Sequence, residues 1–286
     1  MALHRLTEPE GLVDPLVVAA FDGWVDAGSS ATVAAKVLAE KSRIVAEFDG
    51  DQLFDYRARR PTLEIQDGKP ERLTWPTLQL RHRRIGERDV LVLSGAEPDF
   101  RWRRFAAELV EIAKKLKVAQ WISLGAIPAA VPHTRPVPIL GTASRPGLLL
   151  GDVQAGPEGL LRVPAACISV VDIAVSRAGI PAVGYFAQIP HYVSGEYPSA
   201  SAELLRAVGW HLDAEPPMGD LAEEARTLRK RLDTAAALDD KTRQYVERLE
   251  SMVDESRLPA GDDLIADIER FLRDQGTELG GGGRPN

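Results

Sequence analysis

A short apolar run near the N-terminus constrains the fold more than any other feature of the sequence. Leu16-Val-Val-Ala-Ala-Phe21 is continuous and rich in valine, which is typical of a strand buried on both faces. Residues 22–30 follow it with a dense set of Asp, Gly and Ser, and the alanine-rich residues 31–41 predict a helix. A strand, a loop and a helix in this order predict the first unit of an α/β fold.

The middle of the chain mixes strand and helix signals. Residues 43–94 hold short β-like runs at 44–48, 52–54, 62–65, 77–81 and 90–93, so we expect antiparallel strands inserted into an otherwise parallel plan. An apolar stripe at helical spacing predicts a helix over 99–117 with Asp99 as its N-cap. Residues 164–177 are apolar nearly all round and predict a buried helix.

Two regions stand apart from this alternation. Residues 128–160 contain six prolines and five glycines without a helical period, which indicates a functional loop or a lid. From Met218 the pattern is helical, with a bend at Asp239-Asp240 and a last short helix over 264–272. We therefore expect an α/β/α core domain over 1–212, an acidic helical extension over 213–275 and a disordered tail over 276–286.

Composition and charge exclude several classes of protein. The net charge is -7, and residues 213–275 hold 17 acidic and 10 basic side chains. This acidic balance argues against a nucleic-acid partner. One cysteine, Cys167, excludes an internal disulfide framework, and no unbroken apolar stretch reaches the length of a membrane span. We expect a cytoplasmic protein that does not associate with membranes and that holds neither a metal nor a cofactor.

Candidate ligand-binding residues lie where strands are predicted to end. Ligands of parallel α/β sheets bind outside the carboxyl ends of the strands. The loops that follow the predicted strands supply the candidate pocket residues Asp22, Gly23, Trp24, Asp26, Gly28, Gly125, His133, Arg135 and His191.

Each chemical role in this set has a structural alternative. Asp22 and Asp26 could supply a general base or a metal ligand, or could cap the helix that follows them. His133 and Arg135 could bind phosphate or carboxylate, or could pair with neighbouring side chains. His191 is a candidate acid or base, or a residue that hydrogen-bonds backbone. The sequence shows no known catalytic motif, so its catalytic residues are unknown.

Several short motifs are distinctive as a set. They are Gly23-Trp-Val-Asp-Ala-Gly28, Asp55-Tyr-Arg-Ala-Arg-Arg-Pro61, Thr74-Trp-Pro76, Ser123-Leu-Gly-Ala-Ile127 with His133-Thr-Arg-Pro136, and Gly184-Tyr-Phe-Ala-Gln-Ile-Pro-His-Tyr-Val193. Together they resemble the proteasome assembly chaperone family, second-subunit type, in its bacterial, actinobacterial branch. The resemblance implies a three-layer α/β/α core with a mostly parallel mixed sheet, similar to that of nucleoside phosphorylases, plus a C-terminal helical extension. It also implies a homo-oligomer such as a trimer and a role in binding proteasome subunits.

Two hypotheses about function stay open at this point. The first is a self-associating protein-binding protein of the proteasome assembly chaperone type, without established catalysis. The second is a small-molecule enzyme, phosphorylase- or hydrolase-like, that uses the pocket at the strand carboxyl ends. Polar candidates gathered in one deep cleft would favour the enzyme, and an exposed apolar surface would favour the protein-binding protein.

Overall fold

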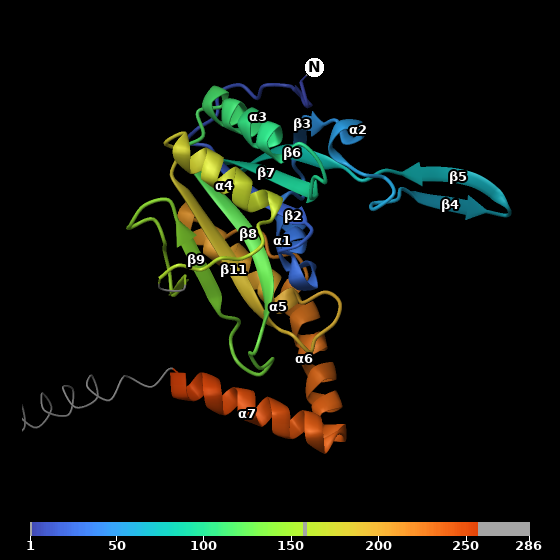
Figure 1. Ribbon diagram of the computed structural model, residues 1–286, viewed down its shortest axis with the longest axis vertical. Helices are drawn as coiled ribbons and strands as arrows, with labels where there is room; N and C mark the ends of the chain where they lie inside the picture. The colour runs from blue at the N-terminus through green and yellow to red at the C-terminus, as the bar shows by residue number, and fades with distance from the viewer. Residues whose placement is uncertain (1, 157–158, 257–286) are drawn as a thin grey trace, which may run out of the picture. The chain divides into compact units, whose positions relative to one another are not determined.

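The computed structural model describes residues 2–156 and 159–256 as two compact units that divide between Thr234 and Ala235. The first unit holds a sheet of nine strands in the order β1-β3-β6-β7-β2-β8-β11-β9-β10, and a separate hairpin of β4 and β5 (Figure 1). The bounds of the strands are β1 His4–Leu6, β2 Leu16–Asp22, β3 Arg43–Phe48, β4 Thr62–Gln66, β5 Lys69–Thr74, β6 Leu78–Ile85, β7 Arg88–Ala96, β8 Gln120–Ala129, β9 Ile139–Ala143, β10 Gln154–Ala155 and β11 Ala182–Pro190.

Helices cover both faces of the sheet. One apolar cluster packs α3 and α4 on one face, and a second packs α1 and α5 on the other (Figure 1). The bounds of the helices are η1 Ala27–Ser29, α1 Ser30–Leu38, α2 Gly50–Leu53, α3 Trp102–Lys115, α4 Cys167–Arg177, α5 Pro198–Leu212, α6 Leu221–Leu238 and α7 Asp240–Ser256. This arrangement confirms the predicted three-layer α/β/α class with a C-terminal helical part.

The sheet is parallel in its centre and antiparallel toward both sides. β7, β2, β8 and β11 pair in parallel, whereas β3 and β6 pair antiparallel beside β7, and β9 pairs antiparallel with β11. β2 lies in the middle of the parallel group and is buried from Leu16 to Phe21, which explains its continuous apolar run. The predicted insertion of antiparallel strands into a parallel plan is confirmed.

Four local predictions are wrong. Residues 52–54 belong to or directly follow the short helix α2 instead of forming a strand. Asp99 does not cap α3, because its carboxylate accepts the N–H of Asp55 and Arg101 stands at the N-cap. The helix α4 is buried on one side only, and Ile173 is 53% exposed. The segment 128–160 is not wholly irregular, because it contains β9 and β10.

The second unit is described as far as residue 256. Asp239 precedes α7 and accepts hydrogen bonds from the backbone N–H and the hydroxyl of Thr242, which confirms a bend capped by an aspartate. The boundary expected between residues 212 and 213 stays a prediction about independent folding. The helix expected over 264–272 and the disordered tail expected over 276–286 lie outside the described residues. No helix in the described chain is long and apolar enough to cross a membrane.

Candidate functional site

The carboxyl ends of the parallel strands bring the predicted loops together at one edge of the sheet. The N–H of Ala126 in β8 donates to the carbonyl oxygen of Val25 at 2.7 Å, so the loop after β2 lies directly against β8. Gly125 fits there because a Cβ atom on it would lie 2.5 Å from Phe186 Cδ1 and 3.1 Å from the same carbonyl oxygen. From the sequence we also expect the Gly23 loop and the Gly125 segment to be neighbours, because both follow parallel strands of one sheet, and the structure confirms this.

Asp26 has the capping role that the sequence left open. Its Oδ1 accepts the N–H of Ala31 at 2.7 Å and that of Thr32 at 3.3 Å, and its Oδ2 accepts the Thr32 hydroxyl. Burial raises the pKa of this carboxyl above its ordinary value, although the hydrogen bonds oppose the shift. These bonds occupy the first N–H groups of α1, so Asp26 shapes the edge of the sheet by fixing the start of this helix.

Glu97 organises the neighbouring loops and was not among the predicted site residues. Its carboxylate accepts the N–H of Trp24 at 3.1 Å and the N–H of Cys167 at 2.6 Å, which joins the loop after β2 to the start of α4. Gly23 is required beside it, because a Cβ atom there would lie 2.1 Å from Glu97 Oε2. The side chain of Trp24 is left 72% exposed. Glu97 lies in the loop four residues after the predicted strand run 90–93, and this position at a strand carboxyl end is the signal that could have found it.

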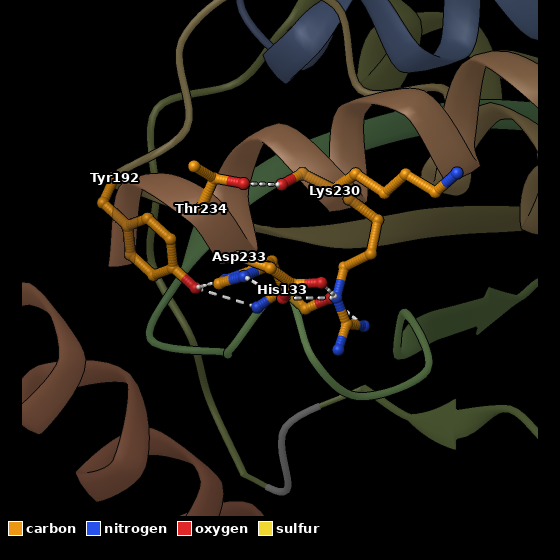
Figure 2. A network of polar contacts seen from close by, with 6 residues as sticks. His133, Tyr192, Lys230, Asp233 and Thr234 are labelled. Atoms are coloured by element: carbon orange, nitrogen blue, oxygen red, sulfur yellow. Dashed lines mark hydrogen bonds and ion pairs between the residues drawn. The ribbon is translucent and has the colours of Figure 1, made fainter. Parts of the chain in front are cut away.

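His133 lies in a polar network that joins three parts of the chain (Figure 2). Its backbone N–H donates to the hydroxyl of Tyr192, and its Nδ1 lies 2.8 Å from the same oxygen. Its Nε2 lies 3.2 Å from Asp233 Oδ1, so Nε2 must carry a proton, because a carboxylate only accepts. Arg229 donates to Asp233 from Nε and to the His133 carbonyl from Nη1. The ring is almost fully enclosed, so the network fixes the loop after β8 against α6.

The remaining candidates lie elsewhere on this edge. His191 is exposed, and its Nδ1 lies 3.0 Å from the carbonyl oxygen of Ala129. Arg135, two residues after His133 in the chain, is partly buried. Gly28 has a φ of 61° and its carbonyl accepts the N–H of Tyr197 at 3.0 Å. Among the described residues, no three His, Cys, Asp or Glu side chains are grouped to hold a metal ion.

A cleft of about 720 Å³ opens at the ends of β2 and β7. Of the nine predicted pocket residues, Asp22 lines this cleft and the other eight do not. Its charged lining comes instead from Lys36 on α1, from Arg59 and Arg60 before β4, and from Glu196 before α5. Arg59 and Arg60 belong to the motif 55–61, which the sequence singles out. The motif alone did not predict that these two side chains line a cleft.

The protein has a three-layer α/β/α fold with a mixed sheet, and its loops gather at the carboxyl ends of four parallel strands. These two features define the class of protein to which it belongs. Within that class, the chain belongs to the PAC2 family, whose family model matches residues 20–236. No curated protein matches the chain significantly.

Solved structures similar to this chain include three from actinobacteria. The proteasome-assembly chaperone homologue Rv2125 of Mycobacterium tuberculosis is 37% identical, with a TM-score of 0.73 over 81% of this chain and 99% of that chain. A PAC2 family protein of Streptomyces avermitilis is 36% identical, with a TM-score of 0.72 over 82% of this chain and 100% of that chain. A Corynebacterium glutamicum protein of unknown function is 28% identical, with a TM-score of 0.83 over 89% of this chain and 98% of that chain.

Proposed function

We propose that this chain binds other proteins as an assembly chaperone of the proteasome type, and that it associates with copies of itself. Membership of the PAC2 family supports the proposal, as does the likeness to a relative described as a proteasome-assembly chaperone homologue. The single observation that carries it is the hairpin of β4 and β5, which projects from the sheet (Figure 1).

Every residue in both strands of this hairpin is exposed. Leu63 and Leu73 are cross-strand partners and therefore point to one face, where they are 48% and 47% exposed. Ile65, on the same strand as Leu63, is 62% exposed. A two-stranded hairpin is marginally stable alone in water, and clustered exposed aliphatic side chains mark protein-binding surfaces. The apolar hairpin face (Leu63, Ile65 and Leu73) therefore suits a protein partner.

Two further exposed apolar side chains on other elements are candidates for self-association. Trp75 stands at the base of the hairpin, 46% exposed, with its ring centroid 4.7 Å from that of Tyr56. Ile173 on the outer side of α4 is 53% exposed. Aromatic anchors and aliphatic side chains of this kind are typical of the centres of protein interfaces. Trp102 on α3, by contrast, packs against the core and donates its indole N–H to the carbonyl oxygen of Pro98.

The test compares two double variants for binding to purified proteasome α-subunits and for mass by light scattering. Leu63→Asp/Leu73→Asp places two charges on the apolar hairpin face. Thr62→Asp/Thr74→Asp adds the same charge to the next cross-strand pair, on the opposite face. We expect the leucine variant to lose α-subunit binding and the threonine variant to keep it. A wild-type mass of one 31.2 kDa chain at every concentration would refute the self-association.

A small-molecule enzyme is the second candidate function, and the cleft at the ends of β2 and β7 is the observation that favours it. Clefts in this position of α/β proteins commonly hold substrates. Asp22 and Glu196 would be the carboxylates available for general base chemistry there. A metabolite-library thermal-shift screen followed by turnover assays tests this candidate. A stabilising compound that the protein consumes would favour it over the chaperone, and stabilisation without turnover would not.

A further inference from the structure

The cleft at the carboxyl ends of β2 and β7 has a cationic character that the acidic chain as a whole lacks. Its floor comes from the ends of the two strands, one wall from α1 and the other from the base of the β4–β5 hairpin. Three cationic side chains line it, Lys36, Arg59 and Arg60, against two carboxylates, Asp22 and Glu196. The lining is therefore net positive in a protein with a net charge of -7.

Two of these cations have their charge available for a ligand. Lys36 and Arg60 are both exposed, and neither forms an ion pair within the part of the chain that the structure describes. They come from different elements of the fold, one from α1 and the other from the segment before β4, and both line the cleft.

Arg59 adds an unsatisfied donor at the same place. Its Nε is buried and has no hydrogen-bond partner among the described residues. The carboxylates near it are too distant for hydrogen bonds, since Asp99 Oδ1 lies 3.7 Å from Nε and Asp22 Oδ2 lies 3.7 Å from Nη1. Because Nε is buried, a ligand in the cleft would contact the partly exposed guanidinium of Arg59 through its Nη groups, which the two long ion pairs leave without a close hydrogen-bond acceptor.

The remaining lining indicates what kind of anion fits. Ser29 and Thr74 bring hydroxyl groups, and Trp75 brings a partly exposed ring to the same cleft. Guanidinium groups bind phosphate through paired hydrogen bonds, and an indole ring stacks on planar groups. The N–H groups at the start of α1 are taken by Asp26, so side chains must supply the charge. The overall negative charge of the protein disfavours a nucleic-acid polymer.

We propose that this cleft binds a small phosphorylated ligand, held by Lys36, Arg59 and Arg60. The site is distinct from the apolar hairpin face, whose three residues do not line it, but it shares Trp75 with the residues proposed for self-association. Asp22 and Glu196 would repel the phosphate group. The ligand must therefore leave both carboxylates solvated or donate hydrogen bonds to them from hydroxyl groups.

Calorimetric titration of the full chain with pyrophosphate and with ADP tests the proposal. The variant Lys36→Gln/Arg60→Gln removes two exposed cations from the cleft. The control Arg57→Gln/Arg103→Gln removes two exposed cations that do not line it. We expect saturable binding of at least one probe, an affinity lowered about tenfold or more in the cleft variant, and wild-type affinity in the control. Equal unfolding midpoints show that both variants are folded.

The two probes also distinguish the source of the phosphate. Tighter binding of ADP than of pyrophosphate, lost in Trp75→Leu, indicates a phosphorylated ligand with a planar ring. Equal binding of both indicates recognition of the phosphates alone. Absence of saturable binding for both probes, or equal losses in the cleft variant and the control, would overturn the proposal. Binding of succinate as tight as that of pyrophosphate would also overturn it, because the site would then select carboxylates.

Discussion

Replacing Asp172 by Asn should stabilise the protein at neutral pH and leave its stability almost unchanged at pH 4. Asp172 lies on α4, and its Oδ1 accepts the hydroxyl of Ser123, which is fully buried in β8. The Ser123 oxygen in turn accepts the indole N–H of Trp121 at 3.1 Å. Asparagine keeps an oxygen acceptor for Ser123 and removes the charge, so the packing of α4 on the sheet is preserved.

The magnitude follows from the burial of this carboxyl. Burial raises the pKa of Asp172 from 3.8 to about 7, with the Ser123 hydrogen bond opposing the shift. Between these two values the folded protein keeps a proton that the unfolded chain releases, so the free energy of unfolding falls as the pH rises from about 4 to 7. At about 1.4 kcal/mol per pKa unit, the loss is about 2 to 4 kcal/mol once water penetration is allowed for.

Urea unfolding of the wild type and Asp172→Asn at a series of pH values measures this effect. The difference in the free energy of unfolding should be near zero at pH 4, grow up to pH 7 and stay constant above it. Asp152→Asn, at an exposed aspartate, is the matched control and should show no such trend. A pH-independent difference, or a variant less stable than the wild type at pH 8, would refute the assignment of a protonated buried carboxyl.

Two further substitutions test single contacts. Tyr192→Phe removes the acceptor of the buried His133 N–H and should lower the free energy of unfolding by about 1–3 kcal/mol in urea titrations, whereas no loss would mean that the network does not hold this loop. Gly95→Ala should destabilise by at least about 2 kcal/mol in the same assay, because Gly95 has a φ of 144° and a Cβ atom there would lie 2.0 Å from the Thr77 carbonyl oxygen. A neutral Gly95→Ala would show that β6 and β7 can separate at this point.

Local patterns were sufficient to predict the parallel centre of the sheet and its main helices. The apolar run at 16–21 is a strand buried on both faces, and the stripe within 99–117 is α3. β9 was missed because proline and glycine dominate its neighbourhood and its pairing partner is β11, about forty residues away in the chain. The exposure of Ile173 was missed because nothing within α4 shows which side the sheet covers.

The candidate site, too, was predictable from the sequence only in part. Parallel strands end at the same edge of a sheet, and this rule predicts that the loops after β2 and β8 lie close together. The structure shows this contact. The contact between His133 and Asp233 joins residues a hundred positions apart, and the cations of the cleft come from α1 and from the segment before β4. Such juxtapositions depend on where whole elements pack, and residue type and spacing do not contain that information.

Hydrogen exchange of the β4–β5 hairpin, measured with and without purified proteasome α-subunits, tests the central claim most directly. Every residue of both strands of the hairpin is exposed in the chain alone, so its amides should exchange rapidly. Binding through the apolar hairpin face predicts slower exchange over residues 62–74 when α-subunits are added, and no slowing in Leu63→Asp/Leu73→Asp. Unchanged exchange over residues 62–74 at saturating α-subunit concentration would contradict the account.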